Sequence, residues 1–230
     1  MITLALDTST RSGGCAVLRG DDLLADVPGN ASRTHAERLP GDLMEVLERA
    51  GLALRDVDVF AVATGPGSFT GLRVGIATMQ GLALAGHRPL VGMSVLDALA
   101  RVAAGADAAS VRVATWVDAW RGEVYAALYD GIREAEGPTV ERPDTILARH
   151  RGTRTLFIGD GAAAHRDVIR QAMGSHGVLA PLVEPPLAGV IGRLARMETA
   201  SGRRPGPADI EPLYVRRPDA ELARDARVER

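Results

Sequence analysis

The order of the predicted elements repeats between the two halves of the chain, and this repeat limits the possible folds more than any other feature. In the first half, a short apolar run ends in Asp7, two strands flank a turn, and then a helix, a buried strand and a second helix follow. The order is therefore βββαβα. These elements cover residues 2–7, 14–27, 34–51, 57–65 and 70–86.

The second half follows the same plan, although its sequence identity to the first half is poor. Its first strand ends in Asp118, as the earlier strand ends in Asp7, and a glycine turn at Gly159 matches the turn at Gly65. The shared order predicts an α/β protein of two related lobes, at 1–105 and 106–230, each a mixed sheet with helices. The second set of elements covers residues 112–118, 122–131, 132–140, 142–150, 155–161 and 162–174, with a further helix over 186–201 and a charged tail over 216–230.

The composition excludes two kinds of catalytic chemistry. All 27 basic residues are arginine, whereas a P-loop and a Schiff-base enzyme both need a lysine. The net charge of −2 provides no basic field of the kind that marks a stand-alone nucleic-acid binder. A lone cysteine, Cys15, indicates a reducing compartment, and we find no signal sequence or long apolar stretch. We therefore expect a cytoplasmic protein that does not bind membranes.

The densest local signal is ATGPGSFTGLRVG, residues 63–75, which joins a predicted strand to a predicted helix. This segment is either a strand-to-helix turn or an anion site formed by the free amides of the helix. Its spacing matches neither a P-loop, nor a dinucleotide fingerprint, nor a nucleophile elbow. The stretch LALDTST, residues 4–10, adds an acid and hydroxyls, but Ser9 stands where actin-like ATPases carry a glycine, and an Asx turn is the alternative. The candidate anion-binding residues are Asp7, Thr8, Ser9, Gly65, Gly67, Ser68, Thr70 and Gly71.

Neither the histidines nor the acidic bend at 117–125 predicts a catalytic centre. A helical metal pair would place its second ligand four residues after His35, where this chain has Leu39. In the bend, Arg121 either bridges the neighbouring acids or belongs to a catalytic group that the spacing does not support. We therefore expect no metal site and no catalytic residue. The ionisable and aromatic residues of the bend are Asp118, Arg121, Glu123 and Tyr125.

The helix predicted over 70–86 is apolar almost all round, with Arg73 as its only charge. A helix that covers one face of a sheet needs a single apolar stripe. We see no further helix in the first lobe that would cover the remaining faces, so the preferred interpretation is a surface that binds another protein. Met44, in the preceding helix, also lies away from its stripe of Leu39, Leu43 and Leu47.

Six motifs together resemble the bacterial TsaB (YeaZ) family, whose members take part in tRNA threonylcarbamoyladenosine synthesis. The resemblance spans residues 2 to about 221 and implies a two-lobed actin/Hsp70-like fold (the ASKHA, ribonuclease H-like type). It also implies a non-catalytic dimerisation subunit whose partners are the transferase TsaD, a paralogue, and the ATPase TsaE. The metal-binding H-x-x-x-H pair of TsaD is incomplete here, because Leu39 replaces the second histidine. The motifs are LALDTST, HAERLP, GPGSFTGLRVG, DAWRGEVY, GDG and YVRRPDAE.

The resemblance further implies that the two helices of the first lobe bind TsaD, and that the same surface forms a homodimer when the chain is alone. It implies no cofactor for this chain, with ATP used by the wider complex and tRNA contacted only through that complex. The implied interface residues are His35, Leu39, Leu43, Leu72, Arg73, Ile76 and Met79.

Two other functions remain open at this point. An independent ATPase or kinase of the same fold would use Asp7, Asp118 and the glycine turns at Gly65 and Gly159. A peptidase would use Ser68 as its nucleophile, although no Ser–His–Asp arrangement with motif support is visible.

Overall fold

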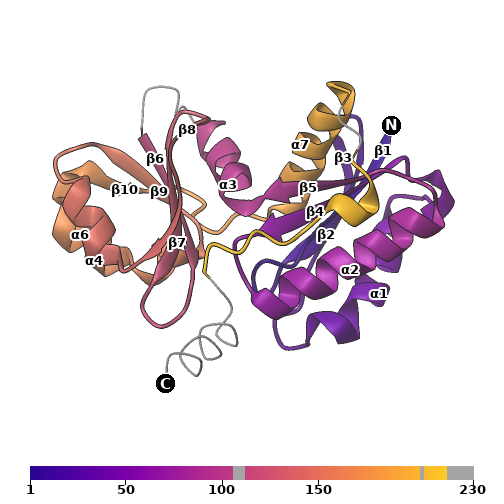
Figure 1. The fold of residues 1–230 in the computed structure, drawn as a ribbon, viewed down its shortest axis with the longest axis horizontal. Coiled ribbons are helices and arrows are strands. Elements are labelled where there is room, and N and C mark those ends of the chain that lie inside the picture. The colour runs from indigo at the N-terminus through magenta and orange to yellow at the C-terminus, as the bar shows by residue number, and fades with distance from the viewer. Residues whose placement is uncertain (106–111, 203–204, 217–230) are drawn as a thin grey trace, which may run out of the picture.

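A computed structural model describes residues 1–105, 112–202 and 205–216, and it confirms an α/β chain with two lobes (Figure 1). Each lobe is built on a five-stranded mixed sheet. Residues 106–111, which follow the expected boundary between the lobes, and the charged tail from residue 217 onward lie outside the described residues. Within the described residues, no helix combines the length and apolar character needed to cross a bilayer.

The first sheet has the strand order β3-β2-β1-β4-β5. The strands β1, β2 and β3 pair antiparallel, whereas β4 and β5 continue from β1 in parallel. The strands cover Ile2–Asp7 (β1), Gly14–Arg19 (β2), Asp22–Pro28 (β3), Val59–Gly65 (β4) and Leu90–Ser94 (β5). The last of these, β5, was not among the elements that we expected from the sequence.

The second sheet repeats the first in topology, with the order β8-β7-β6-β9-β10 when read from the corresponding edge. Again the first three strands pair antiparallel and the last two join in parallel, so the predicted duplication is confirmed. The strands cover Arg112–Asp118 (β6), Val124–Asp130 (β7), Arg133–Glu141 (β8), Thr155–Ile158 (β9) and Gly177–Leu179 (β10).

Alternating side chains of the first sheet pack into two different layers of the core. Leu4 and Leu6 pack with the helices α1 (His35–Arg49) and α2 (Phe69–Ala85), whereas Ala5 packs with α3 (Val95–Ala104) and α7 (Ala188–Ala200). Successive side chains of a strand point to opposite faces of the sheet, so a strand that is covered on both faces contributes to both layers of the core. The inner layer around α3 and α7 also includes residues of β6, β7 and β9, so one apolar core joins the two lobes.

Helix α7 corrects the expected division of the chain. It follows the second sheet in sequence, but it contacts β1, β2, β4 and β5 of the first (Figure 1). Residues 188–200 therefore belong structurally with the first lobe. The outer face of the second sheet is covered instead by α4 (Pro143–Arg149), α5 (Asp160–Ala164) and α6 (Arg166–Met173). Helix α4 confirms the helix expected over 142–150, whereas the helix expected over 162–174 is divided into α5 and α6.

Helix ends follow from local chemistry. At α1, the Thr34 hydroxyl accepts from the backbone N–H of Glu37 while the Glu37 carboxylate accepts from the backbone N–H of Thr34, which is a capping box. At α2, the hydroxyl of Ser68 accepts from the backbone N–H of Gly71 at 3.2 Å. Short 3-10 turns cover Leu54–Asp56, Gly174–His176 and Pro207–Asp209.

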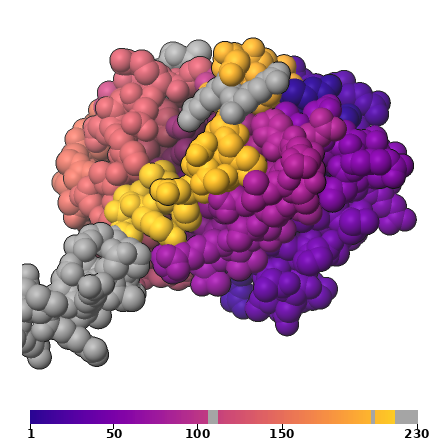
Figure 2. Space-filling view, turned by 45° about the vertical axis from the view of Figure 1, so that its right-hand side comes forward, coloured from indigo at the N-terminus to yellow at the C-terminus, as the bar shows by residue number. Residues whose placement is uncertain are grey.

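Residues 205–216, which we call the C-terminal strap, run across the molecule after α7. Figure 2 shows the strap, in yellow, lying between α2 and the second lobe. Gln80 of α2 donates to the carbonyls of Pro207 and Ile210, and the N–H of Leu213 donates to the carbonyl of Thr64. Further along, Arg216 donates to the carbonyl of Ala119 in the second lobe. The strap thus links the first lobe to the turn between β6 and β7.

Candidate functional site

The two segments predicted to bind an anion, residues 7–9 and 65–71, pack directly against each other. The N–H of Ser68 donates to the carbonyl of Ser9 at 2.7 Å. A Cβ atom at Gly67 would overlap that same carbonyl, and one at Gly71 would overlap the carbonyl of Thr8. Glycine is therefore required at these positions for close backbone approach, and no space remains for an anion between the segments.

The individual candidate residues take structural positions. Thr8 and Ser9 are buried, Ser68 caps α2, and Thr70 points to the surface. Within the described residues, no histidine bonds to the Ser68 hydroxyl. Of the eight predicted residues, Asp7 is the one that lines the open space between the lobes. The structure thus shows the two candidate segments in direct contact, and anion binding by either segment stays a prediction.

The space between the lobes is a cleft of about 510 Å³. Its described lining includes four carboxylates and a single cation, Arg11. Burial raises the pKa of Asp7, against a hydrogen bond from the backbone N–H of Ser9 that opposes the shift, and burial also raises the pKa of Asp160. This described lining therefore offers a phosphate group one cationic partner, Arg11. The four acids are Asp7, Asp26, Asp160 and Glu184.

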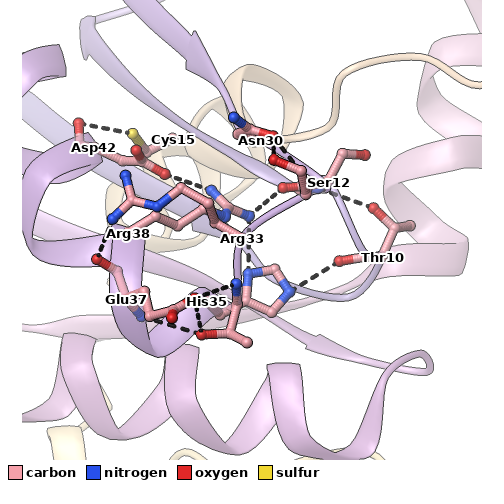
Figure 3. A network of polar contacts seen from close by, with 12 residues as sticks. Thr10, Ser12, Cys15, Asn30, Arg33, His35, Glu37, Arg38 and Asp42 are labelled. Atoms are coloured by element: carbon pink, nitrogen blue, oxygen red, sulfur yellow. Dashed lines mark hydrogen bonds and ion pairs between the residues drawn. The ribbon is translucent and has the colours of Figure 1, made fainter.

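His35 belongs to a polar network rather than to a metal site (Figure 3). Nη2 of Arg38 lies 2.8 Å from Nδ1 of His35, and Nε2 of His35 lies 3.1 Å from the carbonyl oxygen of Thr10. Arginine can only donate, so Nδ1 must accept and Nε2 must carry the hydrogen that goes to Thr10. Burial and the neighbouring Arg38 charge lower the pKa of His35, which favours this neutral form. Neither ring nitrogen is left to bind a metal.

Arg38 is the centre of this network, and only 2% of its surface is exposed. It forms an ion pair with Asp42 one turn along α1, and it donates to the carbonyl of Ser12. Gly29 lies so close that a Cβ atom there would overlap the guanidinium. The sequence analysis missed Arg38, although its place on the Leu39–Leu43 side of α1 was the available signal.

The network ties three elements together at one end of the first lobe. Thr10 and Ser12 lie in the β1–β2 loop, while His35 and Arg38 start α1. A Cβ atom at Gly71 would press on the ring of His35, so the start of α2 rests on this histidine. The starts of α1 and α2 are therefore held in fixed relative positions. Cys15 donates from its thiol to the carbonyl of Asp42, and burial raises the pKa of this thiol to about 12, which disfavours the nucleophilic thiolate form.

The predicted interface residues need correction. Five of the seven are buried in the chain's own core, because the apolar stripes of α1 and α2 pack on the first sheet. A side chain that its own fold already covers cannot contact a partner. His35 is half-buried in the network, and Arg73 remains exposed. The five buried residues are Leu39, Leu43, Leu72, Ile76 and Met79.

The opposite sides of α1 and α2 nevertheless form an exposed surface of the expected kind. The two helices contact each other and lie side by side on one face of the first sheet (Figure 1). Met44 is 64% exposed and Leu84 is 56% exposed, and both helices also expose small residues. We call this surface the outer helical face. It consists of Pro40, Gly41, Met44, Ala77, Gly81 and Leu84.

At the bend between β6 and β7, Arg216 of the strap supplies an ion pair to Glu123 and lies over the ring of Tyr125. The carboxylate of Asp118 accepts from the N–H of Trp120, which closes the turn. The bend therefore has a structural partner that the sequence analysis did not identify. Among the residues that the structure describes, no three His, Cys, Asp or Glu side chains gather closely enough to hold a metal ion.

Comparison with known proteins agrees with the fold and with the motifs. The family model of tRNA N6-adenosine threonylcarbamoyltransferase matches residues 26–223. The structure of YeaZ from Pseudomonas aeruginosa is 31% identical, with a TM-score of 0.75 over 93% of this chain and 99% of that one. Component A of (R)-2-hydroxyglutaryl-CoA dehydratase from Acidaminococcus fermentans is 12% identical, with a TM-score of 0.56 over 87% of this chain and 99% of that one. The two repeated sheets and this second likeness identify the actin/Hsp70-like fold.

The tRNA threonylcarbamoyladenosine biosynthesis protein TsaB of Escherichia coli is 31% identical over 94% of this chain and 95% of its own length. The six motifs, the duplicated fold and this near full-length similarity lead to one conclusion: the chain belongs to the TsaB family.

Proposed function

We propose that this chain is a non-catalytic partner subunit that binds and supports a TsaD-type tRNA N6-adenosine threonylcarbamoyltransferase. In this role it acts with the ATPase TsaE in forming threonylcarbamoyladenosine next to the tRNA anticodon. It forms a homodimer by the same surface when alone, it holds no cofactor of its own, and it meets tRNA only within the complex. The outer helical face is the observation that carries the proposal.

The outer helical face suits helix-on-helix packing. Ala77 and Gly81 are one turn apart on α2, and such small side chains let a second helix approach closely. Leu84 and Met44 flank them with exposed apolar surface, which is unfavourable in water unless a partner covers it. The sequence family model of the transferase matches residues 26–223 of this chain, which include α1 and α2. We therefore expect the transferase to have two equivalent helices that pack on this face.

The cleft favours a supporting role over nucleotide chemistry. Phosphate transfer needs cations or a metal clamp around the transferred group. Here four carboxylates face one arginine, and the glycine-rich turn is occupied by contacts with residues 8 and 9. An independent ATPase or kinase would instead require tight binding of Mg-ATP by the isolated chain and turnover that is lost in Asp7→Ala, both of which calorimetry and a phosphate-release assay can detect.

The outer helical face can be tested with a matched pair of variants. Leu84→Glu places a charge on this face, whereas Leu182→Glu places the same charge on the second lobe at an equally exposed leucine, 57% against 56%. We expect Leu84→Glu to weaken the complex with the purified transferase of the same organism by about tenfold or more, because the interface would bury an unpaired carboxylate. Leu182→Glu should bind as the wild type does.

Two readouts are needed: titration calorimetry of the complex, and threonylcarbamoylation of tRNA in a mixture of transferase, ATPase and the enzyme that supplies the threonylcarbamoyl donor. Equal affinity for the two variants would contradict the placement of the interface. Full modification in the absence of this chain would contradict the subunit role itself.

A further inference from the structure

Arg73 differs from the other residues near the outer helical face, because two aromatic rings hold its side chain in one orientation. Its guanidinium carbon lies 3.9 Å from the centre of the Phe69 ring and 5.6 Å from the centre of the Tyr214 ring. The two rings lie 5.2 Å apart, and Nε of Arg73 donates to the Tyr214 hydroxyl at 2.7 Å. Phe69 and Arg73 belong to α2, whereas Tyr214 belongs to the C-terminal strap.

This arrangement leaves the outer edge of the guanidinium available. Within residues 1–105, 112–202 and 205–216, the hydrogen bond to Tyr214 is the polar contact of Arg73, and none of the acids there forms an ion pair with it. Glu211 lines the same groove without reaching ion-pair distance. Among those residues the two Nη groups of this exposed arginine therefore keep a planar pair of donors without a partner, while stacking restrains the side chain.

The start of α2 reinforces the need for a negative partner. Its first turn contains no acidic residue, so the positive end of the helix dipole is not balanced locally. The guanidinium of Arg73 adds a full charge at the same place. A carboxylate satisfies both charges and matches the guanidinium with two parallel hydrogen bonds.

We propose that Arg73, held by Phe69 and Tyr214, captures a carboxylate of the transferase subunit that packs on the outer helical face, so that the C-terminal strap forms part of the binding site. This inference rests on the proposed function and extends it. A preorganised, stacked arginine at the edge of an apolar contact is typical of interface residues that contribute strongly to affinity. Because the strap itself is held by Gln80 and Thr64, the orientation of Arg73 depends on residues 205–216 being in place.

The test is calorimetric titration of the transferase with the wild type and four variants, at about 50 mM and about 300 mM NaCl. Arg73→Gln removes the charge and the fork, Arg73→Lys keeps only the charge, and Tyr214→Ala removes one wall of the stack. Arg88→Gln is the control, because Arg88 is an exposed arginine just beyond the other end of α2. Thermal unfolding of each variant confirms that the fold is intact.

We expect Arg73→Gln to bind about tenfold to a hundredfold more weakly than the wild type, with a smaller dependence on salt, because the ion pair is lost. The affinities of Arg73→Lys and Tyr214→Ala should lie between those of Arg73→Gln and the wild type, and the affinity of Arg88→Gln should stay within about twofold of the wild type. If Arg73→Gln binds as the wild type does while Leu84→Glu does not bind, the carboxylate contact is wrong and the proposed function stands. If the wild type fails to bind the transferase, both are wrong. If Arg73→Gln weakens tRNA binding and leaves transferase affinity unchanged, the arginine serves a phosphate and the inference is overturned.

Discussion

The buried pair of Arg38 and Asp42 allows the sharpest test of what holds the helical surface in place. In Arg38→Met, the carboxylate of Asp42, whose side chain is 17% exposed, loses its cation, and the carbonyl of Ser12 and Nδ1 of His35 lose their donors. Breaking a buried ion pair costs about 3–5 kcal/mol, and the partial exposure of Asp42 places this case near 3 kcal/mol. For a chain of this size, that loss corresponds to a fall in the unfolding midpoint of about 6–12 °C.

Arg49→Met is the control, because Arg49 pairs with Glu45 on the same helix and at the same spacing, but at the surface. This exposed pair is expected to contribute about 0.3–0.5 kcal/mol. The double variant Arg38→Met/Asp42→Asn should be more stable than Arg38→Met alone by about 1 kcal/mol, because no unpaired charge remains.

The assay is urea unfolding followed by two probes. Both tryptophans, Trp116 and Trp120, lie in the second lobe, so fluorescence reports that lobe while circular dichroism reports the whole chain. Because one apolar core joins the two lobes, the unfolding curves followed by fluorescence and by circular dichroism should coincide. If Arg38→Met lowers the free energy of unfolding by no more than Arg49→Met does, the network around Arg38 does not stabilise the fold and the reasoning is refuted.

Two further predictions concern His35 and Gly67. The pKa of His35 is lowered in the folded chain, so as the pH drops below about 6.5 the imidazole takes up a proton in the unfolded chain before it does so in the folded one. The free energy of unfolding therefore decreases as the pH decreases. His35→Gln should show a smaller fall between about pH 7.5 and about pH 5.5 in urea titrations, and an unchanged fall would contradict the lowered pKa. Gly67→Ala should lower the free energy of unfolding by about 1–3 kcal/mol, since its methyl group overlaps the Ser9 carbonyl. Gly81→Ala, in open space on α2, should instead raise it by about 0.5–1 kcal/mol, and equal effects of the two changes would argue against the close contact at Gly67.

The sequence predicted most elements because their signals are local. The strand over 2–7, the capped helix over 34–51 and the glycine-rich turn each depend on neighbouring residues, and the structure has them within two residues of the expected ends. The edge strands β5 and β10 were missed, since both are short and show no clear alternation of buried and exposed residues. The position of α7 could not be predicted, because amphipathic periodicity shows that a helix has a buried face but not which sheet buries it.

The site shows the same boundary between local and distant information. The stripe of Leu39 and Leu43 was correctly found, but the resemblance offered it as a candidate interface, whereas in the structure it packs in the core of its own lobe. On α2 the apolar residues surround the helix, so composition alone cannot separate Met79, which is buried, from Leu84, which is exposed. The stack of Arg73 on Tyr214 joins residues 141 positions apart, and no local pattern encodes such a contact.

The contacts at one end of the first lobe support the binding role proposed above. The N–H of Ser68 in the glycine-rich turn bonds to the carbonyl of Ser9, and the Ser68 hydroxyl caps α2, so these contacts hold the start of α2. His35 and Arg38 fix the start of α1 in the same region. A partner that meets two helices already held in position loses less conformational entropy on binding than one that must order them first. Variants that loosen this end of the lobe without touching the outer helical face, such as Arg38→Met, should therefore also weaken partner binding, and unchanged affinity in a destabilised but folded variant would show that this preorganisation has no role.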